Sequence, residues 1–373
     1  MLFRSMVIAA VEVVLPYLVR MSYSACNGPV GPLSSSVSSG AALVSPVGVP
    51  GANGSPLPNE GRAPVKQPAN SRAATRGTRR RTGAEVSLTA VIRLDAATVL
   101  LQWAAGGLLF LWFTSRSREV GLGYGWLLRG TNAVLAIGAV FCGFRFGVVP
   151  VREAASIAVA VSSIGALAVS IFRRRAGVSG QTADHDRRTE RIAEMTGIDR
   201  EVGERTDGPE FPPILDLIAP VVAVPGLIAA AVDAGGSTAV SVLRILAGTL
   251  FLGAVTDAML LGHWYLVQPG LPRRHLNELV NALGWIWPIE TAAMLLPTGM
   301  FSVFSGSIDD GWHGQLGWFW AACTVTTIVL VLVTKAALKE RAYSAVMAAT
   351  GLLYLAILTA FGTDLVARAI LAG

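Results

Sequence analysis

The chain has 373 residues, of which 53% are hydrophobic and only 14% are charged, and its formal net charge is +6. Soluble domains have roughly 25% charged residues, so this composition excludes an ordinary soluble protein and predicts one embedded in a lipid bilayer. Basic loops on the cytoplasmic side of a membrane account for the positive charge, so nucleic-acid binding is not predicted. The three cysteines show neither a CxxC spacing nor a Cys/His cluster, and no metal site is predicted.

Residues 1–85 differ in composition from the rest of the chain. Their first part holds a short apolar run that Glu12 interrupts, and the stretch 27–61 is rich in Pro, Gly and Ser. Such a stretch is typical of a disordered segment, and the apolar run is typical of a signal peptide. We therefore expect a disordered or signal-like extension. Our preferred interpretation is that the chosen start codon lies too early and that the natural chain begins near Val86.

The remainder, 86–373, contains eight stretches that are apolar and long enough, at about 20 residues, to cross a bilayer as helices. They lie at 88–114, 125–146, 149–172, 213–232, 238–267, 277–304, 314–334 and 342–367. The expected fold is therefore all-α, a polytopic membrane helical bundle with about eight transmembrane helices. Charges of both signs fill the loop 173–211, which we expect to be solvated and partly helical.

Lys and Arg gather in alternate connections between these stretches, which predicts the orientation of the chain. The connections with basic residues, expected to be cytoplasmic, are 115–124, 173–211, 268–276 and 335–341. The intervening 233–238 and 305–315 contain neither Lys nor Arg, and only Arg145 and Arg152 blur the pattern. Because Arg far outnumbers Lys, we expect a bacterial protein, which makes the inner cell membrane its expected location.

Two neighbouring stretches, 238–267 and 277–304, contain four polar residues that are candidates for function. They are Asp257, His263, Asn281 and Glu290. An ionisable group at the centre of a bilayer costs about 2.5 to 3.5 kcal/mol to insert, which makes it a functional candidate by default. A short turn joins the two stretches, so we expect them to pack as neighbours. We expect two tiers, His263 with Asn281 near the cytoplasmic side and Asp257 with Glu290 near the centre.

Helical geometry limits how these residues act together. Six positions at 100° each place Asp257 and His263 about 120° apart around their helix, so they cannot both face one small ligand. Pro288 and Pro297 each remove a helical hydrogen bond in the second stretch. We therefore expect a kinked, polar helix over 277–304, of the kind that forms the wall of a cavity.

The other charged residues near the ends of the apolar stretches are interpreted as structural. We expect Arg244 to extend its charged end into the water. Asp364 and Arg368 stand four positions apart and should form an ion pair. Asp95 and Asp216 are interpreted as residues at the boundaries of their helices.

The first functional hypothesis is transport of a small solute or of protons along the polar seam between 238–267 and 277–304. Glu290 would be the protonatable coupling residue, and Asp257 would help to bind the cation or substrate. His263 and Asn281 would relay toward the cytoplasm. This is the function that the sequence favours.

The second hypothesis is a membrane redox subunit that holds haem or quinone. His263 would ligate the iron together with a thioether such as Met259, Met294 or Met300. A single intramembrane His cannot supply the two histidines of a bis-imidazole haem, which weighs against this function.

The third hypothesis is a membrane scaffold or assembly protein without transport, or a membrane enzyme. Enzymes that act on lipid-linked substrates usually gather acidic or His residues at one face, and no loop of this chain carries an obvious pair. A scaffold would instead form a stable complex with a protein partner.

Overall fold

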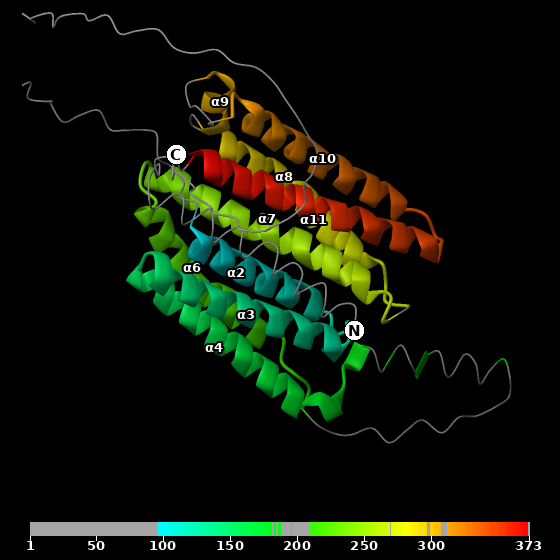
Figure 1. Cartoon of the computed structure of the whole chain (residues 1–373). Helices are drawn as coiled ribbons and strands as arrows, with labels where there is room; N and C mark the ends of the chain where they lie inside the picture. Colours follow the sequence, from blue (N-terminus) through cyan, green and yellow to red (C-terminus); the bar gives the residue numbers. More distant parts are fainter. Residues whose placement is uncertain are drawn as a thin grey trace, which may run out of the picture. The chain divides into compact units, whose positions relative to one another are not determined.

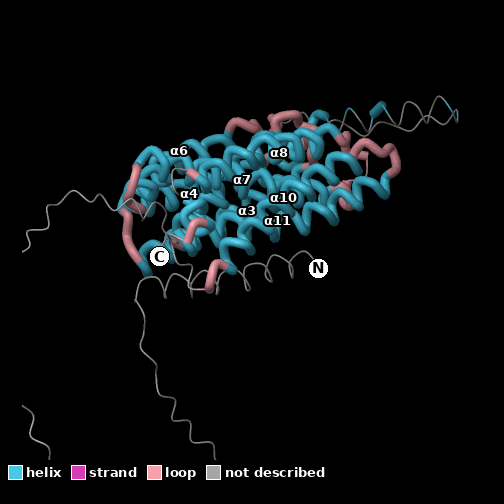
Figure 2. Tube along the Cα trace, turned by 90° about the horizontal axis from the view of Figure 1, so that it is seen from above, coloured by secondary structure: helices cyan, strands magenta, loops and turns pink. Residues whose placement is uncertain are grey.

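The computed structural model describes residues 95–180, 209–268, 270–296, 299–306 and 312–371, together with single positions between 181 and 208. The expected extension 1–85 and most of the loop 173–211 lie outside the described residues. Figure 1 shows the described helices by label, and Figure 2 draws them in cyan from a second direction without any strand.

The described chain is all-α, as the sequence predicts. Nine α-helices and one short 3-10 helix follow one another in the described residues. They are α2 (Ala96–Ser115), α3 (Leu122–Phe146), α4 (Pro150–Phe172), η1 (Arg174–Ala176), α6 (Leu215–Asp233), α7 (Thr238–Trp264), α8 (Arg274–Leu295), α9 (Gly299–Phe304), α10 (Gln315–Ala337) and α11 (Tyr343–Leu371).

Seven of these helices are long and apolar enough to cross a bilayer, so the chain is a multi-pass membrane protein. They are α2, α3, α4, α6, α7, α10 and α11. The eighth long helix, α8, has 22 residues and hence a length of about 33 Å. It runs alongside α7 and α10 but is more polar than the others, because His275, Asn277, Glu278, Asn281 and Glu290 all belong to it.

The sequence analysis expects one kinked helix over 277–304, and the structure corrects this expectation, because it describes two helices there. Helix α8 ends at Leu295, and the six-residue helix α9 begins only at Gly299. Leu296 is extended, with φ −88° and ψ 153°, because a residue that precedes a proline is disfavoured in the helical region. Pro288, by contrast, stands inside α8 without ending it.

The eight long helices form two groups of four (Figure 1). In the first group, α2, α3, α4 and α6 pack in chain order and α6 closes the ring on α2. In the second group, α7 packs on α8, α8 on α10, α10 on α11, and α11 closes the ring on α7. The groups meet where α2 and α6 pack against α7. Helix α7 therefore belongs to the interior of the whole bundle, and its residues 251–262 are all buried.

Hydrogen bonds between connections define two ends of this bundle. At one end, called here the Arg116 end, the Gln268 side chain after α7 donates to the Glu119 carbonyl after α2, at 3.0 Å. At the other end, called the Asp95 end, the Arg152 side chain at the start of α4 reaches Asp95 before α2. Successive long helices run in alternate directions between these ends, as expected of a membrane bundle with short connections.

The two groups touch most closely where Gly106 of α2 meets Gly253 of α7. A Cβ atom added to Gly106 would lie 2.1 Å from the Thr249 carbonyl oxygen, and one added to Gly253 would lie 2.3 Å from the Gly106 carbonyl carbon. No side chain larger than hydrogen fits between these backbones. Small residues allow such close helix approach inside membranes, where van der Waals packing stabilises helix association.

The first group is held together by buried ion pairs. Asp216 of α6 accepts two bonds from Arg129 of α3, at 2.6 and 2.7 Å, and the Arg129 guanidinium lies 4.1 Å from the ring centre of Phe211. At the Asp95 end, Arg152 donates to Asp95 and to its neighbour Glu153. The interpretation of Asp95 and Asp216 as simple boundary residues was therefore incomplete, because each links two helices.

Candidate functional site

The four predicted site residues do not form the expected two tiers. Asp257 and Glu290 are fully buried, His263 is half-buried and Asn281 is exposed on the side of α8 that faces away from the bundle. Glu290 has Arg244, Asp364 and Arg368 as its charged neighbours.

Glu290 belongs to a polar cluster that joins four helices. The charge cluster, as we call it, consists of Gln102 of α2, Arg244 of α7, Glu290 of α8 and Asp364 and Arg368 of α11, each fully buried. Gly248 of α7 makes room for it: a Cβ atom there would lie 3.0 Å from Asp364 Oδ1 and 3.2 Å from Arg368 Nη2. Two arginines and two carboxyl side chains thus meet inside the protein.

Some of the bonding capacity of this cluster is used. Arg368 donates to Asp364 at 2.7 and 3.0 Å, which confirms the expected ion pair. The Gln102 amide nitrogen donates to the Ile245 carbonyl at 2.6 Å.

The sequence analysis expects the charged end of Arg244 to extend into water, but the structure buries it. It donates to the carbonyls of Ala293, at 2.8 Å, and Leu296, at the end of α8. The last carbonyls of a helix have no partner within the helix, so Arg244 satisfies groups that the break after Leu295 leaves open. These hydrogen bonds offset part of the cost of burying the Arg244 guanidinium.

The rest of the bonding capacity is unused in the described residues. Both carboxyl oxygens of Glu290, Nη1 of Arg244, Nη1 of Arg368 and Oε1 of Gln102 are buried without a hydrogen-bond partner. Free donors and free acceptors therefore occur within the same cluster.

Asp257 stands apart from this cluster. It comes 13 residues after Arg244 on α7, which is about 20 Å along the helix axis. Neither of its carboxyl oxygens is hydrogen-bonded to a described residue. Gly253 and the tight crossing with Gly106 lie between Asp257 and the cluster. The expected tier of Asp257 with Glu290 is thus wrong in its depth, since Glu290 lies level with Arg244.

Asp257 and Glu290 differ from every other buried carboxyl that the structure describes. Five carboxyl side chains are buried, and the remaining three each accept a bond of 2.6 or 2.7 Å from an arginine. These three are Glu153, Asp216 and Asp364. Because burying a charged carboxylate without a partner is very costly, such a group commonly holds a proton instead.

His263 lies at the Arg116 end and contacts α11. Its Nδ1 is 3.2 Å from the Tyr354 hydroxyl, and the two rings meet edge to face. Met259 is one turn away on the same helix, whereas Met294 lies at the level of Arg244, about 28 Å along the axis from His263. Of the thioethers expected for a haem, the fold thus leaves Met259 near His263 and separates Met294 from it.

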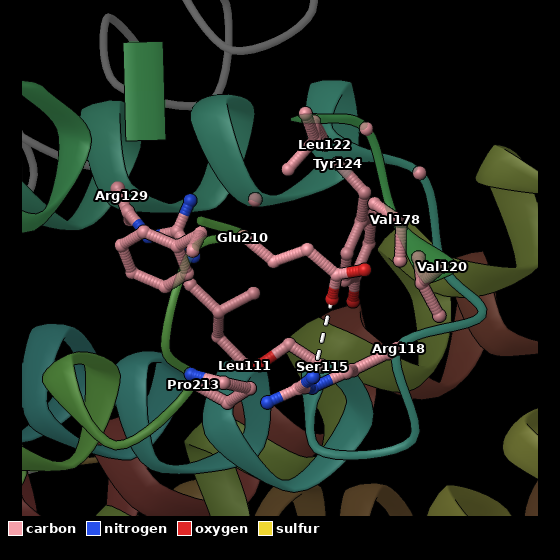
Figure 3. Close-up of a pocket in the computed structure, with 14 residues that line it drawn as sticks. Leu111, Ser115, Arg118, Val120, Leu122, Tyr124, Arg129, Val178, Glu210 and Pro213 are labelled. Carbon is pink, nitrogen blue, oxygen red and sulfur yellow. Dashed lines mark hydrogen bonds and ion pairs between the residues drawn. The ribbon is translucent and has the colours of Figure 1, made fainter. Parts of the chain in front are cut away.

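A small cavity opens at the Arg116 end of the first group (Figure 3). It has a volume of about 40 Å³ and is lined by residues of α2, α3 and the connection between them, by Gly177 and Val178, and by the segment before α6. Arg118 and Glu210 form an ion pair of 3.2 Å beside it, and Tyr124 and Arg129 line its buried part. This volume holds roughly two or three water molecules.

The sequence analysis missed Arg244, Asp364 and Arg368 as members of the site, and it missed Tyr124. Arg244 stands six positions inside the apolar stretch 238–267, a depth that alone predicts burial, whereas Asp364 stands three positions from the end of 342–367 and carries a weaker signal. Tyr124 carries no such signal, because a tyrosine near a helix end is ordinary in membrane proteins.

In comparisons with known proteins, no family model, no curated protein and no solved structure matches the chain.

Proposed function

We propose that the chain is a proton-coupled membrane transporter of a small solute, in which Asp257 and Glu290 take up and release the protons. The observation that carries this proposal is the contrast among the buried carboxyls: three are bonded to arginine, and these two are bonded to nothing described. A carboxyl that is bonded to arginine links parts of the fold and so serves a structural role. An unbonded one inside a membrane is suited to changing its charge.

The charge cluster couples protonation of Glu290 to a movement of helices. With Glu290 neutral, the four ionisable side chains carry a net charge of +1; with Glu290 ionised, the net charge is zero and Glu290 becomes an acceptor for Arg244 or Arg368. A new bond to Arg244 would compete with the bonds that this arginine makes to the end of α8. Loss of a proton would thereby shift α8 against α7 and α11, as a two-state switch in a transporter requires.

The positions of the two carboxyls also suit a path across the membrane. Glu290 lies toward the Asp95 end and Asp257 toward the Arg116 end, with the glycine crossing between them. Each carboxyl would exchange protons with the solution nearer to it, and the close contact of Gly106 with Gly253 would prevent an open leak. We further propose that the Arg116 end, with its basic connections, faces the cytoplasm of a bacterial cell.

The proposal is tested by proton flux in vesicles reconstituted with the purified full chain. A potassium gradient with valinomycin drives protons inward, and an enclosed pH-sensitive dye reports their arrival. We expect faster acidification than in protein-free vesicles, and we expect Glu290→Gln to return the rate to the protein-free value. Glu278→Gln is the matched control on the same helix. Glu278 is exposed, and its ion pair with Arg116, at 3.6 Å, lies outside the charge cluster, so this variant should keep the native rate. Flux in Glu290→Gln equal to that of the native protein would refute the proposal.

A further inference from the structure

The cavity at the Arg116 end lies beside Asp257. The Tyr124 hydroxyl, at the buried wall of the cavity, is 3.5 Å from the backbone carbonyl of Asp257. In this contact the hydroxyl donates to the carbonyl, and neither oxygen of the Asp257 carboxyl has a partner in the described residues. A hydroxyl that can both donate and accept a proton thus belongs to a cavity-lining residue and contacts the backbone of an unbonded buried acid.

The cavity runs from exposed to buried groups. Half of the Arg118 side chain and 24% of the Glu210 side chain are exposed, whereas Tyr124 is 1% exposed. Figure 3 shows Tyr124 and Glu210 projecting into the same space, with the bond of Glu210 to Arg118 dashed. Arg129, the other charged residue that lines it, is engaged by Asp216. Most of the lining is apolar, but Arg118, Glu210 and Tyr124 give this space the two to four polar partners that a water molecule needs.

We propose that this cavity is the aqueous access route through which Asp257 exchanges protons with the solution at the Arg116 end, with the Tyr124 hydroxyl as relay. In the transfer, the O–H proton of Tyr124 passes to the Asp257 carboxylate while a hydronium ion in the cavity gives a proton to the Tyr124 oxygen and becomes water. Tyr124 is neutral before and after, and one proton has moved from the solution to Asp257. The reverse sequence releases it. This inference rests on the proposed role of Asp257 as a proton carrier.

The glycine crossing makes this route specific to one end. Gly106 and Gly253 close the α2–α7 contact four residues beyond Asp257, toward the Asp95 end. Trp103 of α2, on the Asp95 side of Gly106, donates to Thr256 of α7 at 3.0 Å and so bonds the two helices across this crossing. Tyr124 is the cavity-lining hydroxyl that the structure places nearest to Asp257 in the described residues.

The test follows the carbonyl stretch of protonated Asp257 by time-resolved infrared spectroscopy after a pH jump, in the full chain reconstituted in lipid nanodiscs. The Asp257 band is identified by its loss in Asp257→Asn. We expect Tyr124→Phe, which keeps the ring but removes the hydroxyl, to slow the change of this band by about a hundredfold, a magnitude typical of a lost proton-transfer group. Tyr354→Phe, which removes the hydroxyl next to His263 instead, should leave the rate unchanged.

The outcomes separate this inference from the proposed function. If Asp257 changes protonation equally fast in the native protein and in Tyr124→Phe, the access route is wrong while the role of Asp257 stands. If the Asp257 band never changes in the native protein, both are wrong. A change of the unfolding temperature in Tyr124→Phe as large as that in a core truncation would show that the slower rate reflects damage to the fold and would also count against the relay.

A second measurement tests whether the cavity holds water. Leu111 and Leu108 are both buried on α2, one turn apart, but only Leu111 lines the cavity. In a background with Cys26 replaced by serine, we expect Leu111→Cys to react with a small water-soluble methanethiosulfonate about tenfold faster than Leu108→Cys, because the reactive thiolate forms only where water reaches. Equal rates would overturn the proposal of an aqueous route.

Discussion

At the scale of single residues, the molecule contains two kinds of buried carboxyl, and they should respond differently to mutation. Asp216 neutralises Arg129, so Asp216→Asn leaves a buried guanidinium without its counter-charge. Breaking a buried pair in this way costs about 3–5 kcal/mol. Asp257→Asn removes no bond that the structure shows, and we expect its free energy of unfolding to be unchanged or higher. Thermal unfolding in detergent, followed by circular dichroism, measures the difference.

One result of this comparison of unfolding free energies would contradict the account. If Asp257→Asn were as destabilised as Asp216→Asn, Asp257 would be a structural acid with a partner that matters for folding. The conservative change Asp216→Glu serves as control, since it keeps the charge.

How far the sequence predicts the site is also decided at this scale. The rule that charged groups inside apolar stretches are functional candidates selected Asp257 and Glu290, and both are fully buried. The same rule could not predict which residues surround them. Glu290 meets Arg244, Asp364 and Arg368 only because three helices pack together. Hydropathy along the chain does not determine which faces of those helices meet. Asn281 shows the limit most clearly, since its depth suggested a partner and its helix face points away.

At the scale of helices, the contact of α2 with α7 depends on two glycines. In Gly106→Ala, the new methyl group would meet the Thr249 carbonyl at 2.1 Å, which the backbones cannot relieve without moving apart. Overpacking of this kind costs about 1–3 kcal/mol. We expect a lower unfolding temperature and weaker association of the two helix groups, measured by thermal unfolding in detergent.

The matched control is Gly351→Ala on α11, where a Cβ atom would meet nothing within 4 Å. Alanine favours the helix over glycine by up to about 1 kcal/mol, so this variant should be as stable as the native protein or more so. Equal stability of Gly106→Ala and Gly351→Ala would mean that the crossing is looser than the structure shows.

The contact of Glu119 with α8 predicts a pH dependence at the Arg116 end. Burial opposes the charge of Glu119, but the bond from His275 at 2.7 Å and the nearby charge of Arg274 outweigh it, so the pKa of Glu119 lies below its usual range. A lowered folded-state pKa stabilises the protein above the unfolded value of about 4.3, and this stabilisation disappears as the pH falls through the folded value.

Glu119→Gln should therefore narrow the difference in unfolding temperature between pH 6 and acidic solution, roughly pH 3–4, relative to the native chain. Glu278→Gln, which alters an exposed acid at the same end, should leave that difference as it is. An identical acid dependence in Glu119→Gln and the native chain would contradict the proposed contact.

Helix boundaries show where local sequence is sufficient and where it is not. The expected 149–172 and 238–267 agree closely with α4 (Pro150–Phe172) and α7 (Thr238–Trp264), because long apolar runs end at polar connections. The expected 277–304 fails at one point: the structure ends α8 at Leu295, next to Pro297, and tolerates Pro288 inside the helix. Which of two prolines breaks a helix depends on whether other groups satisfy the freed carbonyls, as Arg244 does here.

At the scale of the whole molecule, two groups of four helices meet along α7. Each group closes its own ring of contacts, and a connection with Gly235 and Gly236 at positive φ joins them. Hydropathy predicts the number and order of the long helices but not this pairing, because it does not distinguish one apolar helix from another as a packing partner. The grouping places the charge cluster in the second group and brings Gln102 to it from the first.

A chain divided between Gly235 and Gly236 should therefore still assemble. We expect the two parts, expressed together in one cell with an affinity tag on the first, to be purified together from detergent extracts. Introducing Gly253→Ala into the second part should reduce the recovered amount, because it disturbs the contact that joins the groups. Recovery of the first part alone would show that the short connection, and not the α2–α7 contact, holds the groups together.

The central claim is that Asp257 and Glu290 change protonation inside the folded protein. The most direct measurement is the infrared difference spectrum between acidic and alkaline pH of the lipid-reconstituted chain, recorded for the native protein, Asp257→Asn and Glu290→Gln. We predict a carbonyl stretch of protonated carboxyl groups that disappears at alkaline pH, with a separate part missing in each variant. A difference spectrum in which both variants equal the native protein would contradict the account.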